Sequence, residues 1–143
     1  MKISTKGRYA LRALTHLAVS HETAGNSPVS IKEISVREKI SGRYLENIFV
    51  KLRKAGIVTS VKGEKGGFRL VKAPEKTNLY EIMKAVENDV APSRCVVDLK
   101  TCGRAHKCGI RKIWVKLDRH VNDFMTNTTL AEATDMHNNS DKY

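Results

Sequence analysis

The chain has 143 residues and a formal net charge of +11 at pH 7, a length that suits one domain or one domain with an appended helix. No apolar run approaches the roughly 18 residues of a membrane-spanning helix, and the N-terminus lacks the features of a signal peptide. We therefore expect a cytoplasmic protein without a membrane partner. Residues 1–72 carry 15 Lys/Arg and 5 Asp/Glu, whereas residues 73–143 carry 11 and 10. This asymmetry predicts a polyanion-binding first half joined to a nearly neutral second half.

Two helices are predicted in the first forty residues. Thr5 is the predicted N-cap of the first helix, which runs to about Ser20 with leucines recurring at helical spacing. A loop rich in turn formers follows. Ser30, with Glu33 three residues later, then forms the capping-box pattern that opens a short second helix over residues 31–39.

The next segment predicts a third helix and a hairpin. Ser41 caps the helix and Gly56 ends it. Residues 57–61 and 68–71 are predicted strands, joined by a loop of glycines and lysines. Two short helices followed by a basic hairpin form a winged helix-turn-helix, so the predicted fold class is mainly α with a small β-hairpin. The apolar face of the third helix comprises Tyr44, Leu45, Ile48, Phe49 and Leu52.

The second half predicts helices on either side of a cysteine-bearing loop. One helix is expected over residues 78–87, a long one from about Ile110 to Met125, and a short one over residues 128–134. A small winged domain lacks the surface to cover the apolar stripe of the long helix, so we interpret that stripe as the seam of a homodimer. The predicted seam residues are Ile113, Trp114, Leu117, Val121 and Phe124.

These elements divide the chain into three predicted parts. Residues 1–73 form the winged helix-turn-helix DNA-binding domain, residues 74–134 hold the cysteine loop and the dimerisation helix, and residues 135–143 form a disordered tail. A two-fold dimer would bind two half-sites of a near-palindromic operator in double-stranded DNA.

The third helix carries the residues that would read the DNA. Arg43 can bond guanine and Asn47 adenine through two-point hydrogen bonds, and Glu46 can accept a hydrogen bond from cytosine. The wing lysines suit a minor groove, while other lysines and arginines suit phosphates. Any single lysine also fits a solvated surface, but helix pattern, wing and charge agree with one another. The predicted DNA-binding set is Thr5, Lys6, Arg8, Ser41, Arg43, Tyr44, Glu46, Asn47, Lys51, Arg53, Lys62, Lys65, Gly66 and Gly67.

All three cysteines, Cys95, Cys102 and Cys108, lie within fourteen residues. In a reducing compartment such a group is typical of metal or redox chemistry rather than of disulfides. Zinc usually binds a C-x2-4-C pair, which is absent, whereas iron–sulfur clusters accept wider spacings. A fourth ligand would be a nearby residue, such as His106 or Asp98, or a residue of the partner subunit. The alternative is a metal-free thiol switch, in which cysteine oxidation is the signal.

Four segments together resemble the IscR/NsrR family of bacterial winged-helix transcription regulators over about residues 1–134. They are MKISTKGRYAL, SGRYLENIFVKLRKAGIV, VKGEKGGFRL and the cysteine loop with the Trp-bearing helix after it. The resemblance implies a homodimeric repressor with crossed long helices, not an enzyme. It also implies one iron–sulfur cluster per protomer on the three cysteines, 2Fe–2S favoured over 4Fe–4S, that senses iron, redox state or nitric oxide. The CymR type of the same family lacks these cysteines, which disfavours that branch.

Some family residues match and others differ. Glu46 resembles a recognition-helix glutamate that tunes operator choice, and Lys62 falls where a wing arginine enters the minor groove. Arg111 stands where IscR supplies a histidine ligand, and Arg8 stands where NsrR supplies an aspartate from the other subunit. The resemblance therefore leaves the fourth ligand open. No paired carboxylates, nucleophile motif or phosphate-binding P-loop is present to predict an enzyme.

Overall fold

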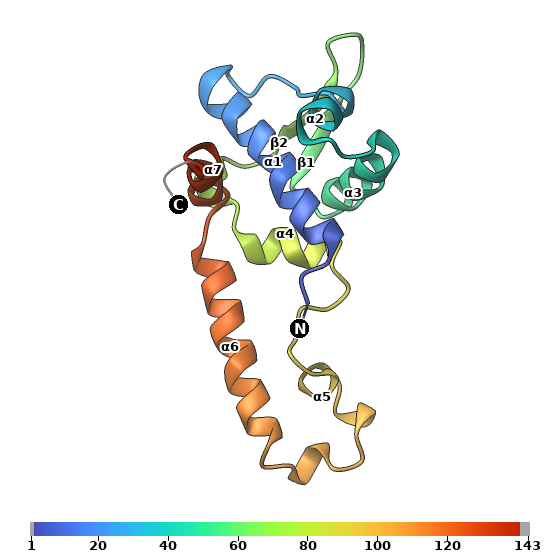
Figure 1. Ribbon diagram of the computed structural model, residues 1–143, viewed down its shortest axis with the longest axis vertical. Helices are drawn as coiled ribbons and strands as arrows, with labels where there is room; N and C mark the ends of the chain where they lie inside the picture. Colours follow the sequence, from blue (N-terminus) through green and yellow to red (C-terminus); the bar gives the residue numbers. More distant parts are fainter. Residues whose placement is uncertain (1, 141–143) are drawn as a thin grey trace.

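A computed structural model describes residues 2–140. They form a head, residues 2–87 and 128–140, from which an arm, residues 88–127, projects (Figure 1). The head contains α1 (Thr5–Thr23), α2 (Ile31–Glu38), α3 (Gly42–Lys54), β1 (Val58–Val61), β2 (Gly67–Leu70), the 3-10 turn η1 (Pro74–Lys76), α4 (Leu79–Val86) and α7 (Leu130–Asn138). The arm contains α5 (Arg94–Val97), the 3-10 turns η2 (Leu99–Thr101) and η3 (Ala105–Lys107), and α6 (Arg111–Asn127).

Side-chain caps explain where the head helices begin. Ser30 Oγ accepts a 3.1 Å hydrogen bond from the Glu33 N–H at the start of α2, as the capping-box pattern predicts. The predicted cap of α1 is wrong by one residue, because Ser4 is the N-cap and Thr5 is already helical. Ser41 lies at the N-cap position of α3, but its side chain makes no capping hydrogen bond.

The hairpin is antiparallel, with a register that runs from Val58 opposite Leu70 to Val61 opposite Gly67. Its strands match the predicted ones to within a residue. Val29 adds a short third pairing, since its N–H and C=O each bond Phe68 at 2.9 Å. Gly67 has a φ of 152°, and a Cβ there would overlap the carbonyl oxygen of Val29. Glycine is therefore required where the hairpin meets the segment before α2.

The core of the head lies around α1, with α3, β2, α4 and α7 packed on it. The predicted apolar face of α3 is confirmed, because Leu45, Ile48, Phe49 and Leu52 are buried. Tyr44 is half-buried and meets Tyr9 edge to face, with ring centroids 5.7 Å apart. Since one face of α3 is fixed in the core, its opposite face must point to solvent. The fold class predicted from the sequence is confirmed.

The chain returns from the arm to the head at α7. The Leu130 N–H donates to Thr77 O at 2.7 Å, and the Leu79 N–H donates to Thr128 O at 3.0 Å. Leu130 and Thr134 are buried against the head. This packing carries α7 to Asn138, into the predicted disordered tail, so that prediction is wrong for residues 135–138; residues 141–143 of the tail lie outside the described residues.

Both ends of the arm are thus fixed to the head, at α4 and at α7 (Figure 1). None of the helices within residues 2–140 is long and apolar enough to cross a membrane.

Candidate DNA-binding face and cysteine loop

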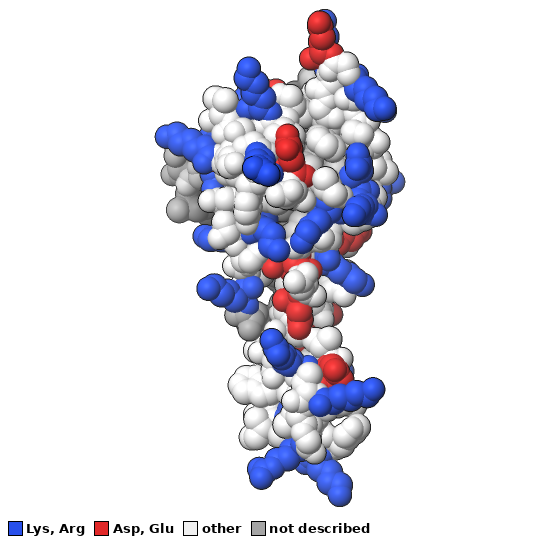
Figure 2. Space-filling view, turned by 90° about the vertical axis from the view of Figure 1, so that its right-hand side faces the viewer, with Lys and Arg blue, Asp and Glu red and all other residues white. Residues whose placement is uncertain are grey.

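The predicted base-reading residues share the outer face of α3. Arg43, Glu46 and Asn47 are all exposed, on the side opposite the buried leucines and Phe49. Figure 2 views the molecule from the α3 side, where Lys and Arg side chains are scattered over the head and outnumber the acidic side chains. The spacing of three and four residues places these side chains on one strip of helix surface. A strip of this kind has the width and chemistry to enter a major groove.

The wing presents its lysines in a tight glycine turn. Lys62 and Lys65 are exposed, and the Gly66 N–H closes the turn by donating to Gly63 O at 3.0 Å. A Cβ at Gly66 would overlap the carbonyl of Val61. The glycines therefore allow a compact loop that extends beyond the strands (Figure 1), and its lysines are exposed to solvent.

The start of α1 adds a second group of cations close to α3. Thr5 Oγ1 accepts a hydrogen bond from Arg8 Nη2 at 3.2 Å. The pKa of Lys51 is lowered, first by partial burial and then by the charge of Lys6, while Glu87 acts in the opposite direction. Two like charges from α1 and α3 thus lie close together. A phosphate bound between them would relieve this repulsion, which fits the predicted phosphate role.

A carboxylate at the end of α2 holds the helix-turn-helix on α1. Glu38 accepts hydrogen bonds from Arg12 Nε at 2.7 Å, and His16 Nε2 lies 2.7 Å from its other oxygen. Arg12 also donates to the Glu38 carbonyl at 3.0 Å. Burial raises the pKa of Glu38, but the hydrogen bonds and charges of His16 and Arg12 outweigh it, so the pKa is lowered. The sequence analysis did not predict this network, because Glu38 lies 26 positions from Arg12 and 22 positions from His16 in the chain.

The three cysteines are all free thiols on the arm. Cys95 and Cys108 are half-buried, Cys102 is exposed, and Ser93 Oγ lies 3.3 Å from Cys95 Sγ. Within residues 2–140 no three His, Cys, Asp or Glu side chains are gathered closely enough to hold a metal ion. The structure therefore does not bring the three thiols together.

The chemistry of the loop nevertheless fits an iron–sulfur cluster. Three thiols on one short loop are the donors that such clusters take. A Cβ added at Gly103 or Gly109 would meet no atom within 4 Å, so the loop has open space in which to rearrange around a group. Arg111 cannot act as a ligand, and its Nε instead donates to Cys95 O at 2.8 Å. His106, the candidate fourth ligand, is exposed in η3.

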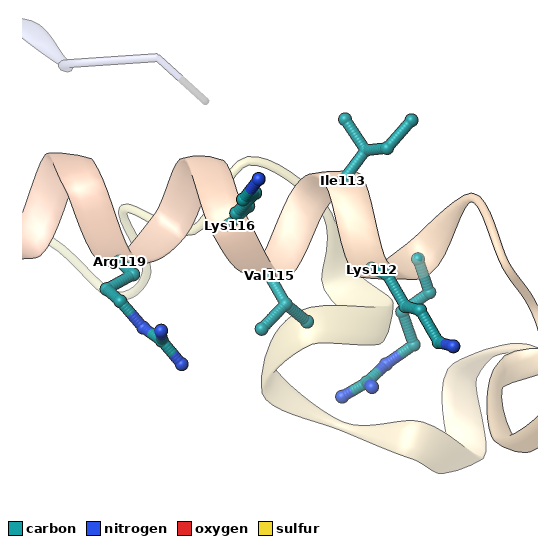
Figure 3. Close-up of a pocket in the computed structure, with 6 residues that line it drawn as sticks. Lys112, Ile113, Val115, Lys116 and Arg119 are labelled. Atoms are coloured by element: carbon teal, nitrogen blue, oxygen red, sulfur yellow. The ribbon is translucent and has the colours of Figure 1, made fainter.

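The long helix α6 presents two different faces. Four large apolar side chains are exposed at its N-cap and along its length: Ile110 at 59%, Ile113 at 56%, Trp114 at 39% and Phe124 at 64%. The predicted seam residues Leu117 and Val121 are half-buried. Figure 3 shows Ile113 on one side of the helix and Val115 and Arg119 on the other. An apolar stripe of this size on a helix that projects from the head is typical of a protein–protein contact.

Together the exposed polar face of α3, the basic wing and the basic start of α1 define a winged helix-turn-helix protein of the DNA-binding class.

Comparison with known proteins identifies the family. The Rrf2 profile, described as an iron-dependent transcriptional regulator, matches residues 3–136. The HTH-type transcriptional regulator IscR of Cereibacter sphaeroides is 40% identical over 134 residues, which cover 92% of this chain and 86% of IscR. The chain therefore belongs to the Rrf2 family of transcriptional regulators, which are not enzymes, and the resemblance seen in the sequence is confirmed.

Solved structures agree with this assignment. CymR, the global cysteine regulator of B. subtilis, superposes with a TM-score of 0.76 at 32% identity, covering 94% of this chain and 97% of CymR. IscR of T. potens superposes with a TM-score of 0.72 at 30% identity, covering 92% of this chain and 85% of that one. The fold is thus common to the CymR and IscR structures.

Proposed function

We propose that this protein is a homodimeric transcriptional repressor whose operator affinity is set by an iron–sulfur cluster, 2Fe–2S in type, on Cys95, Cys102 and Cys108. One observation carries the proposal. The loop with the three thiols lies between α4, which packs on α1 and α3, and α6, which carries the exposed apolar stripe. A change in the loop therefore reaches both the DNA-binding head and the dimer seam.

The DNA contacts follow from the exposed residues. Arg43 and Asn47 contact base edges in the major groove, while Glu46 accepts a hydrogen bond from cytosine. Lys62 and Lys65 of the wing enter the adjacent minor groove. The remaining cations of the DNA-binding face contact phosphates, which supplies affinity without sequence preference.

The cysteine loop is the sensing element. When bound, the cluster supplies a link between the three thiolates that is sensitive to iron supply, oxidants and nitric oxide. The basic neighbours Arg94, Arg104 and Lys107 would offset the negative charge of a bound cluster. The loop itself sets the direction in which the chain leaves α4 and enters α6.

The stripe on α6 forms the dimer seam. A two-fold dimer places two α3 helices at a fixed separation, so operator half-sites must match that separation. A coupling of about 1–3 kcal/mol between loop and DNA would change operator affinity about 5- to 150-fold.

DNA binding by protein with and without its cluster tests this function. A duplex selected by the protein from a random-sequence pool is titrated with anaerobically purified protein and with protein treated with a chelator. We expect tight binding in one state and at least fivefold weaker binding in the other. Equal affinity in both states would contradict cluster control, and the absence of any DNA binding would contradict the repressor assignment.

A metal-free thiol switch is the second candidate, and the exposure of Cys102 favours it. A peroxide would transfer one oxygen to a thiolate, which gives a sulfenic acid, and its other oxygen would leave as water or hydroxide. A second thiol would then attack the sulfenic acid, which forms a disulfide and releases water. Iron and sulfide in the purified protein would contradict this alternative.

A further inference from the structure

Glu87 joins the cysteine loop to the start of α1. It is the C-cap of α4, where the backbone becomes extended and the chain enters the arm. Its Oε1 accepts a 2.9 Å hydrogen bond from the Ser4 N–H and a 2.7 Å hydrogen bond from the Ser4 hydroxyl. Ser4 in turn caps α1 by accepting from the Gly7 N–H at 3.4 Å. One carboxylate oxygen thus holds the residue that begins α1.

Gly7 makes this contact possible. A Cβ at Gly7 would lie 2.5 Å from Glu87 Oε1 and 3.1 Å from Met83 Sδ. The first turn of α1 therefore lies directly against the end of α4, and a side chain at this position would displace the carboxylate. A shift at the end of α4 is transmitted to α1 by contact, since no gap separates them.

Glu87 also lies near the predicted phosphate-binding cations. Its charge acts on Lys51 in α3 against the repulsion that Lys6 exerts. The carboxylate is therefore close enough to attract the charge of Lys51. Its neighbours in the chain, residues 88–109, are the cysteine loop and its flanks.

We infer that Glu87 is the positioning residue through which the cysteine loop controls the DNA-binding face. With its two hydrogen bonds to Ser4 formed, the start of α1 and its cations are fixed for phosphate binding. When the loop moves the end of α4, these bonds break and the cations lose their alignment. This inference rests on the proposed DNA-binding function, but it does not require that the loop hold a cluster.

Alkylation of the cysteines with iodoacetamide perturbs the loop without any metal. Two quantities are measured before and after alkylation: affinity for the duplex selected by the wild-type protein, and hydrogen exchange of the Gly7 and Arg8 amides. In the wild-type protein we expect alkylation to change affinity at least fivefold and to speed this exchange at least fivefold. In Glu87→Ala we expect fast exchange from the outset, and less than a twofold effect of alkylation on either quantity.

Glu81→Ala is the matched control, because Glu81 lies on the same helix but its carboxylate pairs with Lys72 at 2.8 Å instead of α1. It should respond to alkylation as the wild-type protein does. Glu87→Gln, which keeps the side-chain shape, replaces Glu87→Ala if circular dichroism shows that the alanine variant is unfolded. Its amide oxygen can still accept from Ser4, but hydrogen bonds to a neutral oxygen are about half as strong as those to a carboxylate, so we expect its response to fall to about half that of the wild-type protein.

The outcomes separate this inference from the proposed function. A wild-type protein that binds no DNA contradicts the function, and amide exchange then still decides whether Glu87 couples loop and helix. The inference itself is overturned if alkylation leaves α1 exchange unchanged in the wild-type protein. It is also overturned if the Glu87 variants respond as strongly as Glu81→Ala.

Discussion

Replacement of Ile113 by alanine tests whether the stripe on α6 is a dimer seam. Ile113 is 56% exposed. Complete burial of such a side chain contributes about 1.5–3 kcal/mol, so covering its exposed half contributes about 1 kcal/mol per copy. Two-fold symmetry doubles this to about 2 kcal/mol. Because about 1.4 kcal/mol corresponds to tenfold in affinity, we expect the dimer Kd to rise about 30-fold.

Sedimentation equilibrium over a range of protein concentrations measures this change directly. Alanine is a good helix former, so the monomer itself should remain folded. Val71→Ala is a suitable control, because Val71 is 55% exposed but lies on the head after β2. A change of less than threefold for Ile113→Ala, or an equal change for Val71→Ala, would refute the seam.

Three other predictions concern the head. Arg43→Ala should weaken binding to the selected duplex by about 1–3 kcal/mol and relax the sequence preference of the protein. Lys51→Ala should weaken binding to all duplexes alike and reduce the salt dependence of binding. An equal loss of sequence preference in both variants would contradict the base-reading role of Arg43. Glu38→Gln should lower the free energy of unfolding by about 1–3 kcal/mol, with Glu33→Gln, in an exposed pair, near zero as the control. The pKa of Glu38 in the folded protein lies below its ordinary value of 4.5. The contribution of Glu38 to the free energy of unfolding is therefore present above pH 4.5 and is lost as the pH falls through the folded pKa. Urea unfolding from pH 7 to pH 3 measures this contribution. Gly67→Ala should cost about 1–3 kcal/mol through backbone strain, and an unchanged melting temperature would contradict the tight approach seen there.

Local patterns in the sequence predicted the head well. The burial of Leu45 and Phe49 follows from helical spacing, and the hairpin follows from two short segments with apolar residues around a glycine-lysine turn. These signals depend on residues close in the sequence. The shift of the first cap from Thr5 to Ser4 is different, because both residues are good caps and a carboxylate 83 positions away fixes the choice.

Long-range contacts account for what the sequence did not predict. The polar residues after Thr134 have no apolar pattern, yet they continue α7 because Leu130 and Thr134 anchor that helix on the head. The roles of Glu38 and Glu87 likewise depend on partners in α1, and neither residue forms part of a recognisable motif. Whether the cysteines gather around a cluster depends on chemistry as well as on the fold.

The proposed function depends on an iron–sulfur cluster held by the three cysteines. The most direct measurement is the visible absorption, iron content and acid-labile sulfide of protein purified without oxygen, compared with a Cys102→Ser variant. We expect thiolate-to-iron absorption with iron and sulfide in equal amounts, and we expect all three to be reduced or lost in the variant. A colourless wild-type protein that resists reconstitution with iron and sulfide would contradict the proposed function.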